Sequence, residues 1–224
     1  MSSWTPRFMG TGYNERARIL HSYLRLRKEL GLTDLETAHL KQVARRTEKT
    51  DNPLSYAYLD ILKFIVASIS VRSEYRYVSK EADERLGGEE PDYDKMYDGK
   101  DARYNHLTNE HAIPVSVIVD YLLSLPEKEL TVEYLEDFIE KVSGLAAITN
   151  DEDGELINKG RRSNLCDAHD KKFKNLHGVD KAKARADDNR KILKDIIDGN
   201  VEQHKIRYEK AEIKMKKKKH DARA

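Results

Sequence analysis

The chain has 224 residues, of which 36% are charged and 38% belong to the hydrophobic set. This balance is typical of a charge-rich globular protein and excludes a disordered chain. The apolar stretches are far shorter than the roughly 18 residues of a membrane span, and no apolar signal region is evident. The single cysteine excludes an internal disulfide and a cysteine-rich zinc site. We therefore expect a cytoplasmic protein with no membrane partner.

The charge is unevenly distributed along the chain, although the net charge is only +1. Residues 181–224 contain 15 Lys or Arg and 8 Asp or Glu, so residues 1–180 carry a net charge of −6. Within that part, residues 81–101 contain 9 acids and 3 bases. We expect an acidic body with a basic tail that either binds polyanions or folds back onto the acidic segment.

Three helices are predicted in the first 75 residues. Residues 13–30 place their apolar side chains near one side. Thr33 and Glu36 have the spacing of a capping box, which predicts a second helix from there to about residue 47. A polar cap followed by proline at 51–53 predicts the start of the third and most apolar helix. Together these elements predict an N-terminal helical bundle over residues 1–78.

The middle of the chain is expected to contain an acidic linker or excursion and then a mixed, mostly helical segment. Residues 79–104 are rich in glycine, proline and acids, which is typical of a linker. In the segment 105–178, Pro114 begins an apolar helix that Pro126 ends, and Thr131 caps a further helix to about residue 142.

Residues 145–158 are expected to form a small β-hairpin. The stretch 145–149 is short, apolar and partly β-branched, and Asp153-Gly154 is a tight-turn signal. Residues 156–157 then supply apolar side chains for a returning strand.

Residues 179–224 predict a long, basic C-terminal helix or tail. Ile192, Ile196, Ile206 and Ile213 give this segment a thin apolar stripe, through which a homo-oligomer is one alternative. The fold class that follows from all segments is mainly α.

The chemistry of the chain is concentrated at Glu110-His111-Ala112-Ile113-Pro114. Histidine titrates near neutral pH and can take a proton from water. A carboxylate beside it can bind a hard divalent cation, which stabilises charge on a phosphate. Glu110 and His111 are therefore candidates for a metal ligand and a general base in phosphodiester hydrolysis.

An acid followed by His, an apolar residue and Pro resembles the first element of the HNH, or ββα-metal, nuclease family. In that family the acid binds the metal and the histidine is the general base. An Asn and a final metal-binding His follow on a second strand and the helix after it. The resemblance implies Mg²⁺ or another divalent metal. It assigns Glu110 and His169 as metal ligands, with Asp170 or His177 as substitutes for His169. It assigns His111 as the base and Asn164 as the residue that orients it.

The resemblance also sets a topological requirement. His111 and Asn164 are 53 residues apart, whereas the family places a short hairpin there. The match requires residues 115–143 to be an insertion between strands near 110–113 and 145–158. It also departs from the many family members that bind structural zinc through cysteine pairs.

Nucleic acid is the partner that such a site implies. Basic residues flank the later motif or form the end of the chain: Arg161, Arg162, Lys171, Lys172, Lys216, Lys217, Lys218 and Lys219. A run of lysines binds phosphate backbones without sequence preference through counterion release. The alternative for the tail is a solvated helix end.

Each candidate residue also has a structural interpretation. Glu110 can cap the helix that begins near Pro114, and His111 can hydrogen-bond a nearby carbonyl. His169 and Asp170 can lie on a solvated surface, and Cys166 can be a small buried apolar group.

Two functions follow from these observations. The first is a metal-dependent endonuclease of HNH-like type. The alternative is a non-catalytic helical phage or mobile-element protein that binds nucleic acid or inhibits a host protein.

Overall fold

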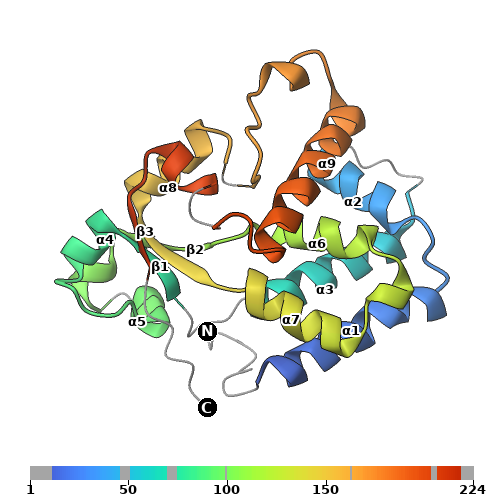
Figure 1. Cartoon of the computed structure of the whole chain (residues 1–224), viewed down its shortest axis with the longest axis horizontal. Coiled ribbons are helices and arrows are strands. Elements are labelled where there is room, and N and C mark those ends of the chain that lie inside the picture. Colours follow the sequence, from blue (N-terminus) through green and yellow to red (C-terminus); the bar gives the residue numbers. More distant parts are fainter. Residues whose placement is uncertain are drawn as a thin grey trace.

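The computed structural model of the chain describes residues 12–45, 51–69, 75–98, 100–161, 163–202 and 206–217. The protein is mainly α, as predicted. A group of helices lies beside a small mixed sheet, and the two parts are joined by several crossings of the chain (Figure 1). No helix among the described residues is long and apolar enough to cross a membrane.

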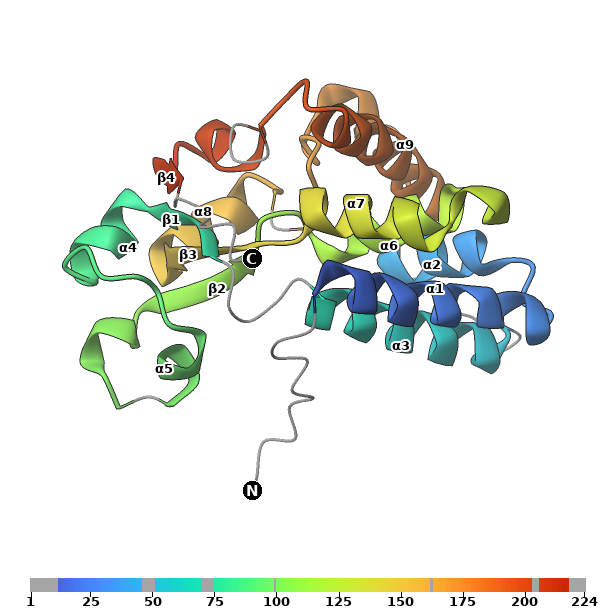
Figure 2. The same ribbon diagram turned by 60° about the horizontal axis from the view of Figure 1, so that its bottom comes forward.

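The helical part draws its elements from most of the chain. They are α1 (Tyr13–Glu29), α2 (Leu35–Val43), α3 (Pro53–Ile69), α6 (Val115–Ser124), α7 (Val132–Val142) and α9 (Gly178–Ile197). Apolar side chains from all of them, Leu20, Leu62, Leu122 and Phe138 among them, share one core or pack against it. α1 lies beside α3 and α7 (Figure 2). The first three helices are therefore part of a larger helical layer.

Most helix starts follow the sequence signals. α3 begins at Pro53, α6 follows Pro114, and the Thr131 hydroxyl accepts a hydrogen bond from the Tyr134 N–H at the start of α7. The second helix differs from its prediction, because Asp34 is its N-cap and makes no side-chain capping bond. With Asp34 as the N-cap, Glu36 is the second helical residue and not the third that a capping box requires. Its carboxylate instead forms an ion pair with Arg190 of α9.

The sheet contains β1 (Tyr75–Ser79), β2 (Leu107–His111), β3 (Leu145–Thr149) and β4 (Met215–Lys217), in the order β2-β3-β1-β4. β1 and β3 are parallel, and the other two pairs are antiparallel. α4 (Lys80–Arg85), α5 (Tyr93–Asp98) and the 3-10 turn η1 (Ala102–Tyr104) connect β1 to β2. Ala82, Leu86 and Tyr104 of this connection pack onto one face of the sheet.

The acidic segment therefore contributes to the core. The boundary proposed between residues 78 and 79 lies inside β1, whose neighbours in the sheet are β3 and β4. Most acidic side chains of the segment are exposed, whereas Ala82, Leu86 and Tyr104 are buried. A composition typical of a linker therefore did not reveal that this segment forms short packed elements.

The predicted hairpin at 145–158 is wrong in its second half. β3 forms as expected, but residues Asn150–Asn158 form α8. The Thr149 hydroxyl accepts a bond from the Glu152 N–H at 3.2 Å, and the Glu152 carboxylate accepts one from the Thr149 N–H at 2.8 Å. This capping box starts a helix where Asp153-Gly154 suggested a turn, and β2 becomes the antiparallel partner of β3.

The long C-terminal helix is also wrong beyond residue 197. α9 ends at Ile197, where Gly199 has a left-handed φ of 76° and donates to the Ile196 carbonyl, as in a helix-closing turn. The chain then returns to the sheet through the 3-10 turn η4 (Glu209–Ala211) and β4. Ile196, Ile206 and Ile213 of the predicted stripe are buried in the protein's own core.

Candidate functional site

Glu110 and His111 lie at the end of β2, beside the start of β3. The pairing places Glu110 opposite Ala146 and His111 opposite Leu145. Successive strand residues point to opposite faces of a sheet, so the two side chains have different surroundings. The β2-β3 pair is followed directly by α8, and helices α6 and α7 (Figure 1) occupy the connection that the resemblance required to be an insertion.

A buried arginine holds Glu110. Arg207 is fully buried, and its Nη2 donates to Glu110 Oε1 at 2.5 Å. Its Nη1 donates to the His111 carbonyl, and its Nε donates to the Arg161 carbonyl at 2.9 Å. One guanidinium therefore connects the end of β2 with the start of the segment that follows α8.

These residues do not fit a divalent metal ion. The Glu110 carboxylate is already neutralised by the guanidinium, and a second cation beside it would be repelled. His169 and Asp170, the other proposed ligands, make contacts elsewhere. Within the described ranges, no group of three or more His, Cys, Asp or Glu side chains is arranged to hold a metal.

The His111 side chain contacts a backbone carbonyl, which was the structural alternative to a catalytic role. Its Nε2 lies 3.4 Å from the Ala67 carbonyl of α3. Burial lowers the pKa of this imidazole, while the Ala67 carbonyl and Glu110 act to raise it. The histidine therefore joins the sheet to the helical layer, and Asn164 is not among its hydrogen-bond partners.

The segment 161–170 places its four candidates in different environments. Arg161 is buried and donates to the carbonyls of Leu165 and Ile206, which removes it from the groups able to meet a phosphate. Asn164 donates to the Gly160 carbonyl. His169 is exposed and lies against Gly160, and Asp170 caps the 3-10 turn η3 (Lys171–Phe173).

The basic candidates are divided between two places. Lys171 and Lys172 are exposed on η3, where Lys172 pairs with Asp188 of α9. Lys216 pairs with Asp83, so the described part of the tail folds back onto the acidic segment. Lys217 approaches Glu202. Arg162, Lys218 and Lys219 lie outside the described residues.

A cleft of about 450 Å³ lies between α2, α6, α9 and the segment 161–170. Its polar lining includes His39, Ser116, Asp120, Ser163, Asn164, Lys181, Arg185 and Asn189. Its apolar lining includes Leu40, Val43, Ala44, Val117, Ala182 and Ala186. The cleft thus brings together side chains from four parts of the sequence, Asn164 among them, and it lies away from the Glu110 centre.

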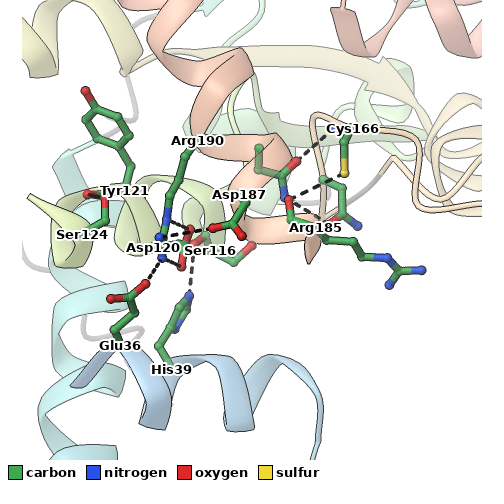
Figure 3. A network of polar contacts seen from close by, with 12 residues as sticks. Glu36, His39, Ser116, Asp120, Tyr121, Ser124, Cys166, Arg185, Asp187 and Arg190 are labelled. Carbon is green, nitrogen blue, oxygen red and sulfur yellow. Dashed lines mark hydrogen bonds and ion pairs between the residues drawn. The ribbon is translucent and has the colours of Figure 1, made fainter. Parts of the chain in front are cut away.

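His39 of α2 is the most unusual group of this lining. It is almost fully buried, and its Nε2 lies 3.2 Å from the Ser116 carbonyl of α6 (Figure 3). Burial and the charge of Lys63 lower its pKa to about 4, so it is neutral at pH 7. Since a carbonyl only accepts, Nε2 carries the proton, and Nδ1 is an acceptor without a partner among the described residues.

Asn189 of α9 fixes the wall that carries Asn164. Its side-chain oxygen accepts the N–H groups of Leu165 and Cys166, each at 2.9 Å, and its amide nitrogen donates to Asn164 Oδ1. Cys166 is buried, and burial raises its pKa to about 11. The thiol is therefore the small apolar group expected from the sequence, and the asparagine pair shapes this side of the cleft.

A second arginine centre borders the cleft. Arg190 of α9 donates two hydrogen bonds, of 2.7 and 2.8 Å, to the carboxylate of Asp120 of α6. It donates a third, of 2.6 Å, to Glu36 of α2. Asp187 lies near the same guanidinium (Figure 3). This network ties the three helices that enclose the cleft.

His39, Arg190 and Arg207 were not among the site residues predicted from the sequence. One signal was available, because Asp120 is the only charged residue in the apolar run 115–125 and a buried acid needs a cationic partner. The partner itself could not be chosen from the many arginines and lysines of the chain.

Comparisons with protein families, with curated proteins and with solved structures found no match to this chain.

Proposed function

We propose that this protein binds nucleic acid in the cleft between α2, α6 and α9. The observation that carries the proposal is a cleft with cationic side chains at α9, neutral hydrogen-bonding groups and an apolar wall. Phosphates, base edges and base faces call for these three kinds of surface.

The charge around the cleft favours a polyanion. Residues 171–185 contain six Lys or Arg and one Asp, in contrast to the acidic segment 81–101. Lys181 and Arg185 line the cleft. η3 packs against α9 beside them and presents exposed Lys171, Lys172 and Lys174. A phosphate backbone can follow this line of charges, since lysine and arginine contacts to phosphates position a strand.

The lining suits the rest of a nucleotide. Ser116, Ser163 and Asn164 offer hydroxyl and amide groups that both donate and accept hydrogen bonds. Leu40, Val43 and Val117 supply apolar surface for a sugar or a base. The volume of about 450 Å³ lies within the range of small-ligand sites, so an unpaired nucleotide fits the cleft better than a duplex.

The direct test is fluorescence anisotropy with labelled single-stranded DNA, single-stranded RNA and duplex DNA. We expect salt-dependent binding with preference for single strands. The variant Lys171→Ala/Lys181→Ala should weaken binding by about tenfold and lower the slope of log K against log salt by about 2, because two phosphate contacts are lost.

A matched control is Lys95→Ala/Lys128→Ala. It removes the same charge from exposed lysines of α5 and η2 (Glu127–Glu129), outside the cleft lining. Equal weakening by both double variants would show that only overall charge matters, and the cleft proposal would then be rejected.

The order of elements at Glu110 favours a second candidate function, phosphodiester hydrolysis at His111. β2, β3 and α8 form an antiparallel pair followed by a helix, and Glu110-His111 ends the first strand. This is the order that the HNH resemblance implies, with α8 as the helix after the second strand in place of residues 164–170. Arg207 holds Glu110 in this structure, so cleavage through Glu110 needs that pair to open.

Plasmid nicking in the presence of added Mg²⁺ or Mn²⁺ tests this second candidate. Activity that disappears in His111→Ala would support it, with Asn164→Ala as a comparison residue. Absence of nicking by the folded wild type, or nicking that survives His111→Ala, would exclude His111 as the base.

A further inference from the structure

We propose that Arg207 is a built-in cation, and that the C-terminal segment 206–217 thereby closes the Glu110 centre to any free divalent ion. The inference does not depend on whether the cleft binds nucleic acid. The oxygen atoms around Arg207 are of the kind that bind a metal ion, but the positive charge among them is that of the arginine side chain.

The oxygen atoms around the guanidinium are of the kind that hard cations prefer. Glu110 Oε1, the His111 carbonyl and the Arg161 carbonyl all accept from Arg207, at 2.5 Å for the first and 2.9 Å for the last. Carboxylate and backbone carbonyl oxygens are ordinary ligands of Ca²⁺ and Mg²⁺. The set comes from two segments about 50 residues apart in sequence, and the guanidinium contacts both.

The chain around Arg207 is fixed by burial. The next residue, Tyr208, is fully buried, and Ala211 and Ile213 pack with it against Ala146 and Leu156. The segment then adds β4 to β1, where Lys216 pairs with Asp83. Arg207 also lies with its guanidinium carbon 5.5 Å from the Tyr208 ring centroid. The cation is therefore held by a packed element of the fold and not by an exposed side chain.

The Glu110 carboxylate already has a cationic partner without an added ion. Glu110 and Arg207 form a neutral pair, with the Tyr208 hydroxyl 3.5 Å from Nη1. A divalent ion bound at the same oxygens would lie within a few ångströms of the guanidinium. Electrostatic repulsion between the ion and the guanidinium is large at that distance in the protein interior. Glu110 can therefore bind a metal only after Arg207 is removed or withdrawn.

The experiment is a titration of the full-length protein with Mn²⁺ alone. The concentration of free Mn²⁺ is measured at each step by electron paramagnetic resonance. We compare the wild type with Arg207→Gln, Arg207→Lys, Glu110→Gln and the double variant Glu110→Gln/Arg207→Gln. Arg207→Gln should bind Mn²⁺ about tenfold more tightly than the wild type, because a contacting positive charge is gone. The gain should disappear in the double variant, and Arg207→Lys should behave as the wild type.

Two results would overturn the proposal. One is a folded Arg207→Gln protein, judged by circular dichroism, whose Mn²⁺ affinity equals that of the wild type. The other is a wild type that binds Mn²⁺ more tightly than Glu110→Gln, because Glu110 would then already be open. Should Arg207→Gln fail to fold, this second comparison decides alone, and equal affinity of the wild type and Glu110→Gln supports the built-in cation.

Discussion

The molecule contains two arginine–carboxylate centres of similar geometry and different surroundings. Arg207 is 0% exposed, and the side chain of its partner Glu110 is 13% exposed. Arg190 is 19% exposed, and the side chain of its partner Asp120, which lines the cleft, is 5% exposed. The more deeply buried partner is thus the arginine in one centre and the carboxylate in the other. Arg207 is therefore shielded from solvent by the fold, whereas Arg190 remains partly open to solvent.

The largest effect that this comparison predicts is the loss of stability in Arg207→Leu. Removing the guanidinium takes one donor from Glu110 and from the carbonyls of His111 and Arg161. Breaking a buried pair by deleting one partner costs about 3–5 kcal/mol. Urea unfolding followed by circular dichroism should show this decrease in the free energy of unfolding.

Glu110→Gln is the control for Arg207→Leu. Its amide oxygen can still accept from Arg207, so its loss should be clearly smaller. The free energies of unfolding of Arg207→Leu and the wild type could instead differ by less than about 1 kcal/mol, as for surface substitutions and solvated ion pairs. The Arg207–Glu110 pair would then be solvated, and the contrast with Arg190 would fail.

The second prediction concerns pH and the cleft. The folded-state pKa of His39 is lowered to about 4, below its unfolded value. Its contribution to stability is therefore complete above about pH 6.5 and is lost as the pH falls toward 4. The full loss is about 3 kcal/mol, from 1.36 kcal/mol for each pKa unit. Unfolding titrations at pH 7, 5.5 and 4 should show it.

His39→Gln tests the assignment, because glutamine cannot take up the proton while it can still donate to the Ser116 carbonyl. The free energy of unfolding of His39→Gln should fall less between pH 7 and pH 4 than that of the wild type, by the contribution of His39. An identical pH dependence in both proteins would mean that other groups, His111 among them, account for the whole effect.

Local signals in the sequence predicted the helices well, because a cap or a proline acts within a few residues. Pro53, Pro114 and Thr131 each mark the start of an observed helix. The hairpin failed for a related reason. Asp153-Gly154 is a turn signal by itself, but Thr149 and Glu152 cap a helix across it, and three local bonds outweighed one glycine.

Only those parts of the site could be predicted whose interacting residues are close together in the sequence. The strand at 145–149 was predicted from its apolar, β-branched residues, but it was paired with residues 155–158, and its pairing with β2 was not predicted. The partners of Glu110 and Asp120 were beyond reach, since Arg207 lies 97 residues from Glu110 and Arg190 lies 70 from Asp120. Such pairs depend on tertiary packing, and a chain with 41 Lys and Arg offers many equivalent choices.

The smallest of the three effects is expected for Arg190→Leu. Asp120 is buried and loses two hydrogen bonds to a charged donor, and Glu36 loses one. Bonds to charged groups contribute about 1.5–3 kcal/mol, and we expect a loss of about 2 kcal/mol in urea unfolding. The loss is smaller than for Arg207 because Arg190 is 19% exposed and its pairing is partly screened by solvent, whereas Arg207 is 0% exposed. Arg190→Lys should recover part of it by pairing with one carboxylate at a time. An equal loss for Arg190→Leu and Arg207→Leu would mean that the partial exposure of Arg190 does not weaken its pairing, and the contrast between the two centres would fail.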